Sequence, residues 1–308
     1  MSNETTVITY KQAKSQINTL GISLFMYIVM MTVVRYAFIL RDELFPAGIN
    51  IFMINVILYG GFLGVTIFSL LPFLISSKVL NLKLKDYFKP TKIKIGTFIS
   101  YVCIGIAIQL TVSSILTLVG LVPSNNIYPQ EFIGVFTSQE AIIINVVYFI
   151  LMVIVKPICD EIVFRGVIQR KLGHFSRSFG VIASAFLYGL AQTSFADFLP
   201  AFFLGMFLSM LCLKYHSVKP AMKVQIGIAL FFILINYIPS QFYTIVLGII
   251  VMVYIIVTFG LFNRLIKLPN LSSRAFEKDL WVMMLSSFSI TLCMVIQAAS
   301  YIVTWIMR

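Results

Sequence analysis

The feature that most constrains the fold is a series of apolar runs, each about as long as a membrane-spanning helix. A helix needs about 20 mainly apolar residues to cross the hydrocarbon core of a bilayer. Runs of this kind lie at residues 18–40, 50–76, 95–120, 140–156, 178–195, 199–214, 221–238, 242–263 and 280–306. Only 11% of the 308 residues are charged, whereas a soluble domain has about 25%. We therefore predict an all-α, polytopic membrane helix bundle of about eight or nine transmembrane helices.

Basic residues gather in every second connection between these runs. The loop 77–94 carries six lysines against Asp86, and further basic clusters lie at 156–177, 214–223 and 264–278. Almost no Lys or Arg occurs in the other connections, near 41–49, 121–139, 196–198 and 239–241. The net charge of +12 then reflects cytoplasmic loops that are rich in Lys and Arg, and we expect no nucleic-acid partner. The pattern predicts a multi-pass protein with a cytoplasmic N-terminus.

The chain reads as one membrane domain over residues 1–308. No low-complexity linker or convincing internal repeat divides it, and the polar first 17 residues do not resemble a signal peptide. The four cysteines lie in or at the ends of apolar runs with no close pair, which indicates core residues and not a disulfide framework or metal site.

The segment Lys156–Arg170, KPICDEIVFRGVIQR, places three ionisable side chains beside apolar sequence. Asp160 and Glu161 form an acidic pair, and Arg165 follows four residues after Glu161. Each charge at membrane depth costs at least about 2.5–3.5 kcal/mol on insertion scales, so such residues are functional candidates. The spacing predicts an ion pair between Glu161 and Arg165 on one helix face.

Local sequence gives an expectation for where this motif lies. Pro157 suits the first turn of a helix, which would put Asp160 and Glu161 near that helix's positive end. Together with the loop charges, this predicts an acidic motif at the cytoplasmic mouth of the bundle. The alternative is a simple boundary helix whose charges lie among the lipid headgroups.

The order of three polar segments resembles that of the CPBP family, the CAAX-protease and bacteriocin-processing (Abi) membrane proteins. The family's first motif is Glu-Glu-x-x-x-Arg, and residues 160–166 (DEIVFRG) differ from it only at Asp160. The second motif is an aromatic residue, three residues, then His; the third is His, three residues, then Asn or Asp. Segments 182–195 and 219–230 occupy the corresponding places. The resemblance covers roughly 140–235 and implies a bacterial cell-membrane protein.

The chain departs from the family at the positions that carry its chemistry. Tyr188 matches the aromatic residue, but Gln192 and Gln225 stand at the two histidine positions and Ala229 at the Asn/Asp position. The resemblance implies an intramembrane endopeptidase whose Glu activates water, with histidines and an Asn assisting. Asp160 is one methylene shorter than Glu, which withdraws its carboxylate by on the order of 1.5 Å. Glutamine donates hydrogen bonds but does not exchange protons near neutral pH.

No metal or cofactor is expected. The two histidines of the chain, His174 and His216, lie at neither family position, and no metal-binding spacing such as HExxH occurs. Glutamines at membrane depth need hydrogen-bond partners. They are compatible with a polar pocket without proton chemistry, or with hydrogen bonds between helices and no ligand, and the sequence leaves both open.

Three functions follow as hypotheses. The first is a catalytically inactive family member that binds and regulates another integral membrane protein, with a sensor kinase or a cell-envelope enzyme as the kind of partner that the resemblance implies. The second is an atypical endopeptidase with Glu161 as base, in CAAX-type or bacteriocin processing or in self-immunity. The third is a transporter or lipid-handling protein using Glu161, Arg165 and Gln225, although no pair of broken helices supports it.

Overall fold

The computed structural model describes residues 10–45, 50–121, 139–192, 194–236 and 277–306, and these residues form helices and no strands. The first half contains α1 (Tyr10–Ile39), α2 (Arg41–Leu44), α3 (Ile51–Phe68), α4 (Leu71–Val79), the 3₁₀ turn η1 (Leu84–Tyr87) and α5 (Ile95–Leu118). The second half contains α6 (Gln139–Phe149), η3 (Ile150–Val155), α7 (Lys156–Glu161), η4 (Ile162–Gln169), α8 (Arg170–Gly173), α9 (Arg177–Leu190), α10 (Phe195–Tyr215), α11 (Lys219–Asn236), α13 (Glu277–Leu285) and α14 (Phe288–Ile306). The predicted all-α class is confirmed.

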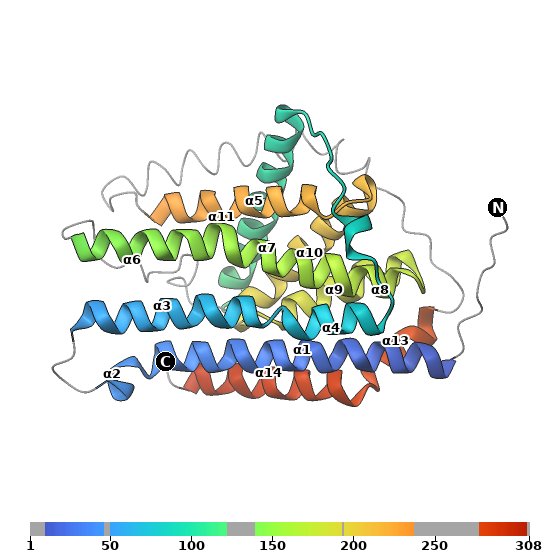
Figure 1. Cartoon of the computed structure of the whole chain (residues 1–308), viewed down its shortest axis with the longest axis horizontal. Coiled ribbons are helices and arrows are strands. Elements are labelled where there is room, and N and C mark those ends of the chain that lie inside the picture. Colours follow the sequence, from blue (N-terminus) through green and yellow to red (C-terminus); the bar gives the residue numbers. More distant parts are fainter. Residues whose placement is uncertain (1–9, 46–49, 122–138, 193, 237–276, 307–308) are drawn as a thin grey trace.

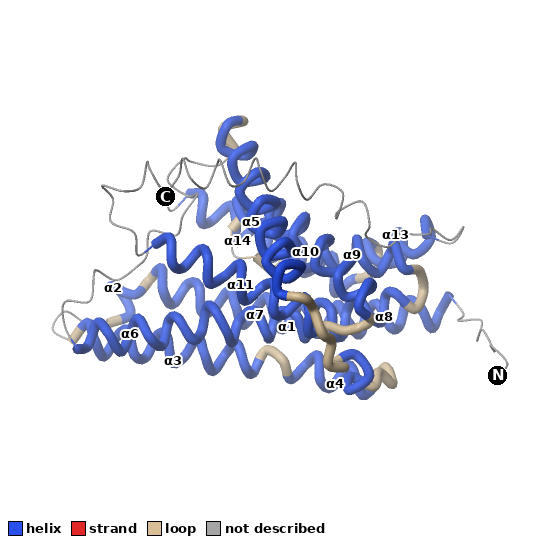
Figure 2. The backbone as a smooth tube through the Cα atoms, turned by 90° about the horizontal axis from the view of Figure 1, so that it is seen from above, coloured by secondary structure: helices blue, strands red, loops and turns tan. Residues whose placement is uncertain are grey.

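Most of the long helices lie side by side along the long axis of the molecule. In Figure 1 they follow one another in the order α14, α1, α3 with α4, α6 with α7 and α8, and α11. Helix α1 packs against α14, α3 and α4, so the first and the last long helix lie side by side (Figure 1). Helix α5 crosses the long axis in both views and packs on α10 and α11 (Figures 1 and 2).

Among the described residues, five helical segments are long and apolar enough to cross a membrane, or six if the pair α13 and α14, bent by 63°, counts as one span. Helix α9 covers the predicted run 178–195 only as far as Leu190 and has 14 residues. Helix α11 begins at the predicted run 221–238, and the run 242–263 lies outside the described residues, as does most of the predicted outer loop 121–139. The described chain is a multi-pass helical membrane protein.

The acidic motif lies inside one uninterrupted helix and not at the beginning of one. From α6 to α8 the helix runs from Gln139 to Gly173 without a break, and its apolar span covers Ile142–Gly173. Two stretches of it, η3 and η4, have π-helical turns. The expectation that a span ends at residue 156 and a new helix begins at Pro157 is therefore wrong.

The π-helical turns explain how a proline is accommodated there. In a regular α-helix the ring of Pro157 would clash with the carbonyl four residues earlier. Here the N–H of Lys156 donates to the carbonyl of Leu151, five residues back, which is the hydrogen bond of a π-helix. The wider turn leaves room for the ring. Because Val155 already has helical backbone angles, no free helix end is present to stabilise Asp160 and Glu161.

Glycine at position 180 sets the distance between the end of this helix and α9. A Cβ at Gly180 would lie 2.6 Å from the backbone Cα and N of Gly173 and 3.0 Å from the carbonyl oxygen of Gln169. Backbone atoms cannot move aside as a flexible side chain can, so α8 and α9 approach this closely only through Gly180. The contact fixes the motif helix against the helix that carries Tyr188.

Replacing Gly180 with Val is expected to destabilise the fold by about 1–3 kcal/mol, because the added side chain overpacks a backbone contact. Thermal unfolding of the purified full-length protein in detergent measures the effect. Gly61→Val in α3 is the matched control, since nothing lies within 4 Å of a Cβ at Gly61. Equal melting temperatures for the two variants would contradict the assigned contact.

Candidate functional site

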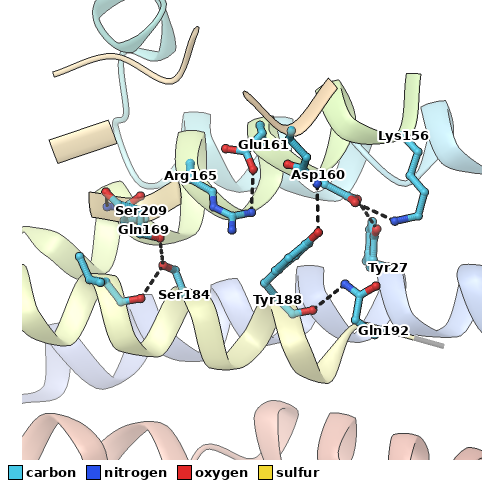
Figure 3. Close-up of polar contacts among 12 residues, drawn as sticks. Tyr27, Lys156, Asp160, Glu161, Arg165, Gln169, Ser184, Tyr188, Gln192 and Ser209 are labelled. Carbon is cyan, nitrogen blue, oxygen red and sulfur yellow. Dashed lines mark hydrogen bonds and ion pairs between the residues drawn. The ribbon is translucent and has the colours of Figure 1, made fainter. Parts of the chain in front are cut away.

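The predicted ion pair between Glu161 and Arg165 is confirmed. Arg165 Nη1 lies 2.9 Å from Glu161 Oε1, and both side chains are fully buried at 0% exposure. The pair links the last residue of α7 to the first turn of η4, one helical turn apart, as Figure 3 shows. Two complementary charges in the interior thus neutralise one another within a single helix.

Neighbouring helices hold the guanidinium group of Arg165 in place. Its carbon lies 4.4 Å from the ring centroid of Tyr188 in α9, a cation–π contact. On α10, a Cβ at Gly205 would lie 3.2 Å from Arg165 Nη2 and 3.1 Å from the Cα of Ala185. Gly205 therefore gives the guanidinium its space between α9 and α10.

Asp160 has its own two partners and takes no part in that ion pair. Lys156 Nζ lies 2.8 Å from Asp160 Oδ2, and the hydroxyl of Tyr27 donates to Asp160 Oδ1 at 2.8 Å. Asp160 is buried, while 30% of the Lys156 side chain is exposed. Both carboxylate oxygens are thus held by donors, one from the same helix and one from α1 (Figure 3).

Tyr188 joins the two glutamines that stand at the family's histidine positions. The side-chain nitrogen of Gln192 donates to the backbone carbonyl of Tyr188 at 3.0 Å, and that of Gln225 donates to the Tyr188 hydroxyl at 3.0 Å. Gln225 thus bonds between helices. Gln192 bonds back onto its own turn, as Figure 3 shows. Ala229 lies one turn beyond Gln225 on α11, half-buried and without a polar side-chain atom.

The last helix also reaches the site, although it lies outside the segment that the sequence singled out. The Gln297 side chain and the Tyr301 hydroxyl both donate to the backbone carbonyl of Gln192, Tyr301 at 2.9 Å. These contacts fix the chain where α9 ends. Neither residue was identified from the sequence, because nothing in the sequence relates α14 to position 192.

A second polar cluster lies one to two turns beyond Arg165. Gln169 donates through Nε2 to the carbonyl of Ser209 at 2.9 Å, and the hydroxyls of Ser184 and Ser209 are 3.3 Å apart. All three side chains are buried. They tie η4, α9 and α10 together, and isolated serines in apolar helices gave no sequence signal for them.

The motif is buried within an apolar helical span, and its place at the cytoplasmic mouth of the bundle stays a prediction. Asp160 and Glu161 are 1% and 0% exposed and lie well within the apolar span Ile142–Gly173. The two histidines lie at helix ends, His174 after α8 and His216 after α10. Partial burial, with Lys171 and Arg170 as neighbours, lowers the pKa of His174.

The arrangement is suited to holding a fixed geometry. Asp160 accepts from Lys156 and Tyr27, and both glutamine nitrogens donate to Tyr188. In the described part of the chain, Glu161 Oε2 has no hydrogen-bond partner. Proton transfer needs a side chain that exchanges protons within reach of the reacting group, and glutamine does not do so.

Replacing Lys156 with Met is expected to destabilise the protein by about 2 kcal/mol, because it leaves the buried Asp160 carboxylate without its counter-charge. The value lies below the ~3–5 kcal/mol of fully buried pairs because Lys156 is partly exposed. The double variant Lys156→Met/Asp160→Asn should recover most of the loss. Thermal unfolding of the wild type, both single variants and the double variant measures the coupling, and strictly additive losses would contradict a direct pair.

Comparison with known proteins agrees with the sequence resemblance. A family model described as type II CAAX prenyl endopeptidase Rce1-like matches residues 142–231. A search of curated proteins and a search of solved structures found no match. The matched segment contains the motif helix, Tyr188, Gln192 and Gln225, and lies within the predicted core of 140–235. Residues 142–231 of this membrane protein therefore form an Rce1-like domain of the CPBP family.

Proposed function

We propose that this chain is a non-catalytic CAAX-protease-like membrane protein that binds and regulates another integral membrane protein. The observation that carries the proposal is that both carboxylate oxygens of Asp160 already accept hydrogen bonds. Asp160 stands at the first acidic position of the family motif. Its two oxygens accept from Lys156 and from Tyr27 of α1. A general base needs a lone pair directed at the proton it removes, and these donors compete for that role.

The two glutamines support the same proposal. Each stands where the family has a proton-exchanging histidine, and each donates one amide N–H to Tyr188. Losing one oxyanion donor alone typically costs about 10²–10³ in rate. Here the histidine positions and the Asn/Asp position are changed together, while the buried Glu161–Arg165 ion pair and its contact with the Tyr188 ring are present. A site that keeps this ion pair but lacks the proton-transfer groups suits a binding protein.

An atypical endopeptidase is the second candidate, and one observation favours it. Glu161 is a buried carboxylate whose Oε2 has no hydrogen-bond partner among the described residues. In that function Glu161 would activate water, and Gln225 would donate to the oxyanion. The ion pair with Arg165 at 2.9 Å opposes it, because Oε1 of the same carboxylate is already engaged with a guanidinium.

We also propose that the protein lies in a bacterial cell membrane with its N-terminus in the cytoplasm. Three basic connections support this orientation because they contact one another at one end of the bundle. The Lys171 side chain donates to the carbonyl of Leu80, and the Ser217 hydroxyl donates to the carbonyl of Lys89. The loops after α4, α8 and α10 therefore share a side, as the positive-inside rule requires.

Affinity purification of the tagged full-length chain from gently solubilised native membranes tests the proposed function. We expect a near-stoichiometric integral membrane protein to co-purify, as measured by quantitative mass spectrometry. The double variant Lys156→Met/Asp160→Asn should retain it, because the substitution removes the acidic group but keeps the site neutral. A folded double variant that loses the partner, or a wild type without any stable partner, would contradict a binding role that is independent of the carboxylate.

A further inference from the structure

The segment between α4 and α5, residues 80–94, crosses the end of the motif helix and is called the strap here. It leaves α4 after Val79, forms the 3₁₀ turn η1 and reaches α5 at Ile95. Figure 1 shows it rising from α4 past α8 to the beginning of α5. The strap itself lies outside the family segment 142–231, although it contacts residues of that segment.

Two aromatic side chains of the strap face the motif helix. The ring of Tyr87 lies under the guanidinium of Arg170, 4.0 Å from its carbon to the ring centroid. The ring of Phe88 lies against Gly166, where an added Cβ would be 3.9 Å from Phe88 Cζ. Gly166 directly follows Arg165, so the strap packs one residue from the buried ion pair.

Hydrogen bonds to its backbone carbonyls hold the strap against the end of the motif helix and against the residues before α11. Its Leu80 carbonyl accepts from Lys171 Nζ at 3.2 Å. The carbonyl of Tyr87 accepts from the Val218 N–H at 2.8 Å, and that of Lys89 accepts from the Ser217 hydroxyl at 2.8 Å. Ser217 and Val218 precede α11, which carries Gln225. The strap therefore ties the motif helix to the helix of the third motif segment.

The other side of the strap is exposed and basic. Five lysines of the strap are exposed, with Asp86 as the one acidic residue among them: Lys83, Lys85, Lys89, Lys92 and Lys94. Lys78, at the end of α4, is exposed as well. Within the described part of the chain none of these lysines forms an ion pair. Lysine ammonium groups on flexible stems bind phosphate groups as point charges.

We propose that the outer face of the strap binds anionic phospholipid headgroups of the bilayer, and that this binding holds its inner face on the motif helix. The helices at its two ends, α4 and α5, belong to segments long and apolar enough to cross a membrane. Lysines beside such helices gain about fivefold in affinity each for an anionic membrane surface. The proposal concerns this surface and does not depend on whether the site is catalytic.

Hydrogen–deuterium exchange of the full-length protein in nanodiscs tests the surface. Nanodiscs of phosphatidylcholine alone are compared with nanodiscs in which part of the lipid is phosphatidylglycerol. We expect slower exchange of residues 80–94 in the anionic discs, and loss of that protection in high salt. The variant Lys85→Gln/Lys89→Gln/Lys92→Gln should abolish most of it, since three lysines account for about 100-fold in affinity.

The matched control removes three exposed lysines from elsewhere, in Lys11→Gln/Lys14→Gln/Lys278→Gln, and should keep the protection. Exchange that does not depend on lipid charge, or that changes equally in both triple variants, overturns the proposal. So does protection given by an acidic peptide or by inorganic phosphate in phosphatidylcholine discs but not by phosphatidylglycerol. Those two results would assign the surface to an acidic protein segment or to free phosphate.

The link to the site has a separate test. In Tyr87→Leu the strap keeps its lysines but loses the ring under Arg170. We expect anionic discs still to protect residues 80–94 in this variant, but no longer to slow the exchange of residues 170–176. Equal lipid-dependent protection of residues 170–176 in Tyr87→Leu and in the wild type would overturn the proposed link, which runs through the Tyr87 ring.

Discussion

The buried ion pair between Glu161 and Arg165 is the interaction on which the arrangement around it depends. Both side chains are fully buried inside an apolar span, and leaving either one alone would cost about 3–5 kcal/mol. The pair is tolerated only with a fixed geometry, which two neighbours and the helical spacing of the pair supply. Tyr188 faces the guanidinium, Gly205 leaves it space, and the spacing of four residues brings the two charges to one helix face.

The second acidic residue obeys the same rule with different partners. Asp160 is compensated by Lys156, also four residues away, and by the hydroxyl of Tyr27. Two carboxylates and two cations thus cancel within ten residues of one helix. This balance explains how the apolar span Ile142–Gly173 accommodates these four charges. Asp160 and Glu161 therefore have different partners, whereas activation of one water by both carboxylates would require them to act together.

Charge spacing was the part of the site that the sequence could predict. The same spacing that predicted the Glu161–Arg165 pair also relates Lys156 to Asp160. That second pair was missed because Lys156 was assigned to a basic cytoplasmic loop. Tyr27, Gln297 and Tyr301 could not be predicted, since they reach the site through the packing of α1 and α14, far away in sequence.

The fold, too, could be predicted from the sequence only in part. Apolar runs predicted the helical class and the membrane-spanning segments, because length and composition determine them directly. Helix ends were less predictable. Pro157 indicated a beginning, but a π-helical hydrogen bond from Lys156 to Leu151 carries the helix past it. A change in hydrogen-bond register depends on the surrounding packing, and the residue order alone does not record it.

The central claim is that the site keeps its buried ion pair but does not cleave peptides. A quantitative survey of protein N-termini in native cells tests this claim most directly. Cells with the wild-type chain are compared with cells without it, and with cells expressing the charge-neutral variant Glu161→Gln/Arg165→Met. The structure predicts no new terminus that depends on the chain. Termini that appear with the wild type and vanish in a folded Glu161→Gln/Arg165→Met variant would contradict this claim and assign Glu161 a catalytic role.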